Sequence, residues 1–157
     1  MVPDEELLSR AINIVSEVQV GLLCTCDQGA PRARWMSALS EDGLRTLHTL
    51  SAEGTRKIEE LAHNPRVCWV FTWSDYADIV TLQGSATVHH GALAAAAAWD
   101  RLTRAARAYA VGSLSAEEHL ELTTIRTTVE RIEIISADYG VVAPREIALG
   151  QALEEDP

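Results

Sequence analysis

The chemistry that stands out in the sequence is a pair of adjacent cations in an acidic chain. Lys57 is the only lysine among 157 residues of formal net charge −10, and it follows Thr55 and Arg56 where a strand-like run gives way to a helix-like run. A helix N-terminus has unpaired N–H groups, and these three side chains would add charge-assisted hydrogen bonds to an anion there. The segment is therefore a candidate phosphate site; the alternative is an ordinary solvated first turn of a helix.

A second basic segment covers residues 31–39. Strand alternation gives it two faces, with Arg32, Arg34 and Met36 on one and Ala33, Trp35 and Ser37 on the other. Two unpaired guanidiniums cannot be buried, so Arg32 and Arg34 must meet an anion, carboxylates or solvent. The alternative interpretation is an exposed edge strand with Trp35 in the core.

The common catalytic signatures are absent from the sequence. It contains no G-x-S-x-G, Walker P-loop, Rossmann G-x-G-x-x-G or HExxH motif. Nothing holds Ser37, His48 and an aspartate in register as a nucleophilic triad. His89 and His90 are adjacent at the end of a strand-like run, so they face opposite sides and are not expected to bind one metal ion.

The three cysteines, Cys24, Cys26 and Cys68, have no disulfide-framework spacing, which fits a reducing, cytoplasmic compartment. Cys24 and Cys26 would share one face of a strand and, with His48, could be imagined as metal ligands. We favour small buried core residues instead, because free cysteine is among the most buried residue types. No metal site is expected.

Composition narrows the class of protein. A length of 157 residues with 47% apolar content suits one domain, 1–157, with an acidic and frayed tail at 150–157. The acidic balance argues against nucleic acid and against an acidic membrane surface. The most apolar run, 91–99, is too short to span a bilayer. The acidic start, residues 1–6, does not resemble a secretory leader.

The elements that must position the basic segments follow from apolar periodicity and turn residues. Helices are expected at 3–18, 55–63, 92–109 and 115–127. Strands are expected at 20–26, 31–39, 44–50, 67–73, 78–90 and 129–135. Gly84 marks a bulge or bend that would let its strand curl. Six short strands in sequence, with helices between and after them, predict a small β-barrel with helices at its ends.

In this order and spacing the motifs resemble the FMN-binding split-barrel family. The motifs are Arg34-Trp35-Met36-Ser37, His48-Thr49, Thr55-Arg56-Lys57, and the helix that ends in His63-Asn64-Pro65. That family includes pyridoxamine 5'-phosphate oxidase and the bacterial general stress proteins, and the chain is most similar to the latter. The resemblance implies a mainly β (α+β) fold, a six-stranded split β-barrel of the Greek-key type with peripheral helices. It also implies a homodimer with two flavins at the subunit interface.

The resemblance further implies a role for each matching residue. Arg34 and Lys57, with Thr55 and Arg56, would hold the FMN phosphate; Trp35, Met36 and Ser37 would run beside the isoalloxazine and ribityl chain; His48 and Thr49 would contact the flavin from the neighbouring strand. Because the flavin supplies hydride and electron transfer, no side chain is expected to be catalytic. Residues 136–157 contain Arg145 as their only arginine and no histidine, so vitamin B6 oxidation is not expected.

The sequence therefore predicts a cytoplasmic, homodimeric, FMN-dependent oxidoreductase of a small-molecule substrate. A deazaflavin-dependent reductase of the same fold is the nearest alternative, although its longer anionic tail would need basic residues near the first helix, where Arg10 is the only one. A non-catalytic flavin-binding stress protein and a scaffold that binds nothing are the others. Basic side chains that lie apart, or that are neutralised by their own acidic neighbours, would contradict the predicted phosphate site.

Overall fold

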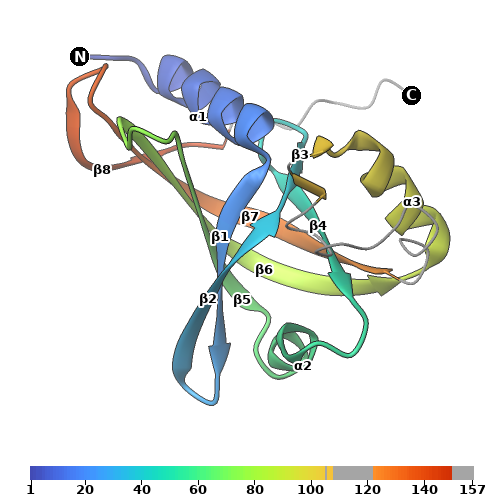
Figure 1. Cartoon of the computed structure of the whole chain (residues 1–157). Helices are drawn as coiled ribbons and strands as arrows, with labels where there is room; N and C mark the ends of the chain where they lie inside the picture. Colours follow the sequence, from blue (N-terminus) through green and yellow to red (C-terminus); the bar gives the residue numbers. More distant parts are fainter. Residues whose placement is uncertain (105, 108–121, 150–157) are drawn as a thin grey trace, which may run out of the picture.

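The computed structural model of the chain describes residues 1–104, 106–107 and 122–149. Three helices and eight strands fall within these residues (Figure 1). The helices are α1 (Asp4–Val18), α2 (Arg56–His63) and α3 (Ala92–Arg101). The strands are β1 (Val20–Asp27), β2 (Ala30–Ser37), β3 (Leu39–Glu41), β4 (Thr46–Ala52), β5 (Arg66–Thr72), β6 (Asp78–His90), β7 (Leu122–Ser136) and β8 (Val141–Ile147). The predicted fold class, a barrel-like antiparallel sheet with peripheral helices, is confirmed.

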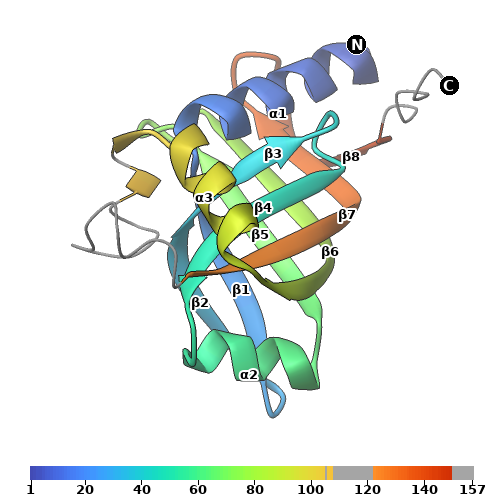
Figure 2. The ribbon, with the colours of Figure 1, turned by 90° about the vertical axis from the view of Figure 1, so that its right-hand side faces the viewer.

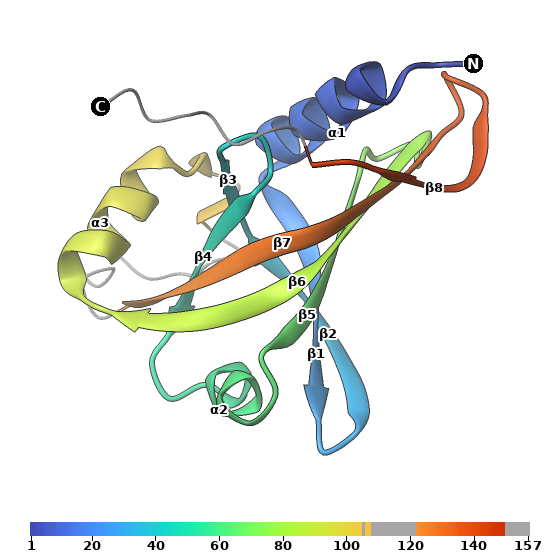
Figure 3. The same cartoon turned by 180° about the vertical axis from the view of Figure 1, so that it is seen from behind.

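The eight strands form one sheet in the order β2-β1-β5-β6-β7-β4-β3, and β8 pairs with β7 beside this path. The long strands β6 and β7 curve, so the sheet curls into an open barrel, as Figure 1 and Figure 3 show. The register of this pair shifts between Gln83 and Gly84. A Cβ atom at Gly84 would lie 2.0 Å from the Thr128 carbonyl oxygen, so only glycine fits this close approach. The predicted bulge at Gly84 is confirmed.

The barrel interior holds the main core. The rings of Trp69 and Phe71 stack with their centroids 5.7 Å apart, and the Trp69 indole N–H donates to Thr127 Oγ1 over 3.1 Å. Helix α1 closes one end of the barrel by burying Leu7 and Ile14 against this core (Figure 2). Within the described residues no helix combines the length and the apolar character needed to cross a bilayer.

A second, smaller core lies outside the barrel. Helix α3 covers β3 and β4 from the outside (Figure 2), and its Trp99 packs in one cluster with Leu39 and Leu50. Residues of β4 therefore alternate between two cores. Leu47 is buried in the interior, whereas Leu50 is buried under α3.

The described part of the chain has eight strands instead of the predicted six. The predicted strand 31–39 is two strands, because the chain turns at Ala38, whose N–H donates to the Gln19 carbonyl over 2.9 Å. Strand β8 was not predicted, since Val141–Ile147 includes a proline and is mostly exposed. The predicted helix 115–127 is wrong over 122–127, where β-branched residues extend β7. Residues 115–121 and the predicted tail 150–157 lie outside the described residues.

Candidate functional site

The junction between β4 and α2 places the predicted phosphate-binding residues. Ser51 ends the inward-facing set of β4, Gly54 makes the turn with φ +74°, and α2 begins at Arg56. Thr55 occupies the N-cap position, but its hydroxyl makes no capping hydrogen bond. Its Oγ1 lies 3.0 Å from Ser51 Oγ instead, so the two hydroxyls form a small polar platform beside the first turn of α2.

Lys57 rests on this platform. Its ammonium donates to Ser51 Oγ over 3.0 Å and to Thr55 Oγ1 over 3.2 Å, and it forms no ion pair with any residue that the structure describes. The pKa of Lys57 is lowered because burial strips water from the ammonium and because the Arg34 guanidinium is near; Glu60 offsets only part of this. A cation in this environment is stabilised by an added anion.

Arg34 reaches the same region from β2, but it is already paired. One of its nitrogens lies 2.9 Å from Glu60 Oε2, and the other donates to Thr25 Oγ1 over 2.6 Å. Glu60 is 4% exposed, and its Oε1 lies 3.4 Å from Arg56 Nε and 3.7 Å from Arg32 Nε. A single buried carboxylate is thus shared by three guanidiniums.

The charges of this cluster do not balance. Arg32, Arg34, Arg56 and Lys57 bring four positive charges, and the carboxylates that pair with them are those of Glu60 and Asp27. Two arginines of the predicted phosphate site are therefore partly neutralised by their own acidic neighbour, whereas Lys57 forms no direct ion pair with a described carboxylate. An excess of positive charge remains where Lys57 and Arg34 approach each other.

Glu60 is the functional residue that the sequence reasoning did not identify. A glutamate on a charged helix usually faces solvent, and its burial here depends on the β1–β2 hairpin lying against α2. Its spacing of four residues from Arg56 was the available signal, since such pairs face each other on a helix. The need of Arg32 and Arg34 for a carboxylate was the second signal.

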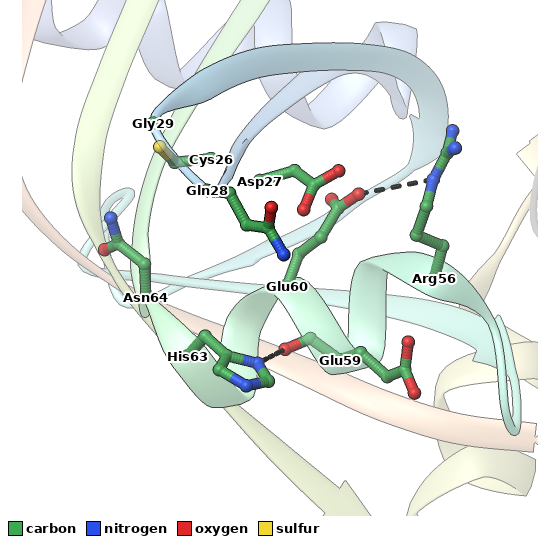
Figure 4. Close-up of a pocket in the computed structure, with 9 residues that line it drawn as sticks. All are labelled: Cys26, Asp27, Gln28, Gly29, Arg56, Glu59, Glu60, His63 and Asn64. Carbon is green, nitrogen blue, oxygen red and sulfur yellow. Dashed lines mark hydrogen bonds and ion pairs between the residues drawn. The ribbon is translucent and has the colours of Figure 1, made fainter.

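A cavity of about 470 Å³ lies between the β1–β2 turn and α2. Figure 4 shows the side chains that line it. Asp27, Glu59 and Glu60 contribute carboxylates to its lining, and Arg56 is the residue of the predicted site that it includes. The carboxylates make this cavity a poor place for a phosphate. Lys57 does not line it, so the candidate anion position lies outside this cavity.

The predicted faces of β2 are found, with Trp35 and Met36 on opposite sides. Met36 is buried in the main core, whereas Trp35 is 52% exposed on the outer face. The strand is an edge strand, as its place at one end of the sheet order shows. The alternative interpretation that put Trp35 in the core is therefore wrong. Ser37 is fully buried, and its Oγ has no hydrogen-bond partner.

His48 and Thr49 lie on opposite faces of β4. The His48 ring lies 3.1 Å from Glu41 Oε2, and Arg101 of α3 also bonds this carboxylate. Thr49 points into the barrel on the same face as Ser51, is 2% exposed, and its Oγ1 has no hydrogen-bond partner. The structure thus brings Thr49 to the Lys57 side of the barrel and leaves His48 on the α3 side.

The cluster fits a phosphate ester. Its donors are the ammonium of Lys57, the guanidinium of Arg34 and the hydroxyls of Ser51 and Thr55, and charge-assisted bonds from such groups are the strong ones in anion sites. The buried hydroxyl of Thr49 has no hydrogen-bond partner and is an additional donor. The described residues include no group of three or more metal-ligating side chains.

Sequence comparisons give the chain a family. The family model described as "Pyridoxamine 5'-phosphate oxidase" matches residues 9–136. General stress protein 26 of Bacillus subtilis (strain 168) is 32% identical over 63 residues, which are 40% of this chain and 44% of that protein. The chain therefore matches less than half the length of this relative.

Solved structures show the same fold. A Clostridium acetobutylicum protein related to general stress protein 26 superposes with a TM-score of 0.71 at 18% identity, covering 93% of this chain and 96% of its own. An FAD-binding protein from Mesorhizobium loti gives 0.62 at 17% identity, covering 80% and 91%. An F420 reductase gives 0.61 at 14% identity, covering 76% and 93%. Likenesses at this identity establish the fold alone.

Proposed function

Because the chain belongs to the pyridoxamine 5'-phosphate oxidase family, we propose that it is an FMN-dependent oxidoreductase that holds the flavin phosphate at the β4–α2 junction. One observation carries the proposal. Lys57 is a half-buried cation with two hydroxyl partners and no ion pair to a carboxylate among the described residues, and partial burial and the nearby Arg34 lower its pKa. A phosphate there would pair with the ammonium and remove the charge imbalance.

The residues of this chain divide into two groups in the proposed complex. Lys57, Arg34, Thr55 and Arg56 hold the phosphate, with Ser51 and Thr49 as added hydroxyl donors. Trp35 and Ser37 face the other side of β2, and His48 faces the α3 side of β4. Since β2 is an edge strand, a ligand anchored at Lys57 would have to pass around its open edge to meet both of its sides. The Met36 side chain is packed in the core, so its backbone is the part that can meet the flavin.

The bound flavin supplies hydride and electron transfer. The protein contributes binding and orientation: Lys57 and Arg34 fix the anionic end, and Glu41 fixes the His48 ring. The proposed substrate is a small molecule, and the turnover test below asks whether the bound flavin is reduced and passes its electrons on.

The deazaflavin alternative depends on basic residues near α1. Arg10 is bonded to Asp78 and Asp138, with its Nε 3.1 Å from Asp78 Oδ2 and a terminal nitrogen 2.9 Å from Asp138 Oδ2. A guanidinium that already serves two carboxylates is a weak partner for an anionic tail. This favours FMN. Because an F420 reductase has the same fold, the cofactor test below also looks for a deazaflavin.

We also propose the homodimer. Trp35 exposes half of its surface on an edge strand, and a tryptophan is a frequent anchor of a protein interface. A second copy of the chain would cover it. Sedimentation should give twice the chain mass, and Trp35→Lys should shift the protein toward the monomer. A monomeric wild type at micromolar concentration would overturn this part.

The colour and the released small molecules of the purified protein test the cofactor. A yellow preparation that releases FMN supports the proposal, and a deazaflavin supports the alternative. A colourless protein that does not bind added FMN supports a scaffold. Turnover needs a separate test, in which NADH or NADPH is added to the FMN-bound protein under anaerobic conditions. If the bound FMN is not reduced and no acceptor is turned over, a non-catalytic flavin-binding stress protein is supported.

A further inference from the structure

Two cysteines face each other across neighbouring strands on the outside of the barrel. In the antiparallel pair of β1 and β5, Cys24 is the register partner of Cys68. The preceding pair, Leu23 and Trp69, is fully buried in the interior, so strand alternation places both thiols on the outer face. Both are free thiols and half-buried.

The thiols line an open groove of about 300 Å³ on this face, together with Cys26, Arg66 and Gln83. Burial raises the pKa of Cys24 and of Cys68, and the pKa of Cys68 is raised further by Cys24 and Glu133. The thiolate that reacts with a peroxide is therefore a minor species near neutral pH, and the oxidation should become faster as pH rises. The described residues also offer no third ligand for a metal site of three or more groups. The reaction that a facing pair of thiols can still undergo is two-electron oxidation to a disulfide.

We propose that Cys24 and Cys68 are a redox pair that a hydroperoxide converts to a cross-strand disulfide. One sulfur attacks a peroxide oxygen, the O–O bond breaks, and a sulfenic acid and water (or an alcohol) result. The second sulfur attacks the sulfenic sulfur, an S–S bond forms, and the hydroxyl leaves with the thiol proton as water. Two thiols lose two electrons and two protons, and the peroxide is reduced.

Backbone geometry selects this pair over the other cysteine. Directly opposed residues in an antiparallel pair have Cα atoms about 4.5–5.5 Å apart, inside the range of about 4.4–6.8 Å that disulfides need. Cys26 lies two residues along β1 from Cys24, about 6.8 Å away, with its side chain parallel to that of Cys24. Cys26 is therefore a matched control within the same groove.

The pair lies directly behind the arginine cluster. Thr25, next to Cys24, faces inward, donates to Glu60 Oε2 over 2.5 Å and accepts from Arg34. A disulfide would close a loop between β1 and β5 and restrict the strand that carries Thr25. The expected consequence is a more stable fold, because a long closed loop limits the unfolded chain.

The full-length protein is treated with hydrogen peroxide, alkylated, and analysed by intact mass and by non-reducing peptide mapping. The wild type and Cys26→Ser should each lose two hydrogen atoms, show one Cys24–Cys68 linked peptide, and recover both thiols with dithiothreitol. Melting temperature should rise by roughly 5 °C or more on oxidation. Cys68→Ser should lose the link and the rise together.

Three outcomes overturn the proposal: addition of oxygen atoms to separate thiols in the wild type, a link that includes Cys26, or a covalent dimer as the main product. If Cys68→Ser does not fold, the peptide maps of the wild type and of Cys26→Ser still decide. Neither measurement uses flavin, so the result is independent of the function proposed above.

Discussion

Two buried carboxylates organise arginines at different places in the barrel, and the charge balance around them is opposite. Asp78 is fully buried and meets one guanidinium, that of Arg10, which also bonds Asp138. Glu60 is almost fully buried and meets three guanidiniums. At Asp78 the carboxylates outnumber the cations, whereas at Glu60 the cations outnumber the carboxylates.

The pKa values of the cations report the same contrast. The pKa of Arg10 is raised, chiefly because it donates a hydrogen bond to Asp78. The pKa of Lys57, beside the Glu60 cluster, is lowered by burial and by Arg34. The cluster of Arg10, Asp78 and Asp138 stabilises its own cation, so it needs no further anion and contributes to the stability of the fold. A cluster that destabilises its cation can be stabilised by an added anion, and this supports the phosphate site proposed on the Lys57 side.

Removing the cations of the proposed phosphate site should have the largest effect on FMN binding. Arg34→Ala combined with Lys57→Ala should weaken FMN binding by roughly 100- to 10,000-fold, because two charge-assisted contacts of about 1.5–3 kcal/mol each are lost. Titration by flavin fluorescence measures the affinity. Lys57→Ala alone is the control for folding, since it leaves the Arg34–Glu60 pair intact. Unchanged affinity in the double variant would contradict the site.

The second test removes the cation of the complete cluster. Arg10→Met leaves Asp78 buried without its guanidinium and should lower the free energy of unfolding by about 3 kcal/mol. Affinity for FMN should not change. Arg131→Met is the matched control, because Arg131 also pairs with two carboxylates but is 47% exposed, and it should change stability by less than about 1 kcal/mol. Urea denaturation measures both. Weaker FMN binding in Arg10→Met would show that α1 belongs to the ligand site.

A ligand phosphate would compete with Glu60 for Arg34. Glu60→Gln removes one negative charge and keeps the size of the side chain. At low ionic strength it should strengthen FMN binding by about fivefold, roughly 1 kcal/mol, and the gain should shrink at high salt. Calorimetric titration at two ionic strengths measures this. Weaker binding in Glu60→Gln at both would mean that Glu60 holds Arg34 in place for the ligand.

Some residues of the candidate site could be predicted from the sequence, and others could not. Lys57 and Thr55 were predictable because their chemistry is local: a lone lysine in the first turn of a helix that follows a strand. Glu60 was not, because its burial depends on a hairpin more than twenty residues away in the chain. His48 was expected to meet a flavin, and the Glu41 partner that holds its ring depends on the β3–β4 register. Residues 122–127 were predicted to be helical from their local pattern, and the prediction is wrong because pairing with β4 and β6 outweighs that pattern.

The smallest expected effect is the pH dependence of binding, and it tests the cause of the imbalance directly. Lys57 is faced by the hydroxyls of Ser51 and Thr55 and by the charges of Arg34 and Glu60. Its folded-state pKa lies below the ordinary value of 10.5, so the unfolded chain binds more protons in the window just below 10.5. The stability of the free protein should therefore rise with pH in that window.

Binding should show the opposite trend, because the phosphate pairs with protonated Lys57. The flavin phosphate is a dianion well above a pKa of about 6, so its own titration does not contribute on the alkaline side. Affinity for FMN should fall as pH rises through the lowered pKa of Lys57, in the range below 10.5. Lys57→Arg stays charged over this range and should lose the fall. If the affinity of Lys57→Arg for FMN fell in the same way at alkaline pH, the fall would belong to another titrating group. The lowered pKa of Lys57 would then have no role in FMN binding.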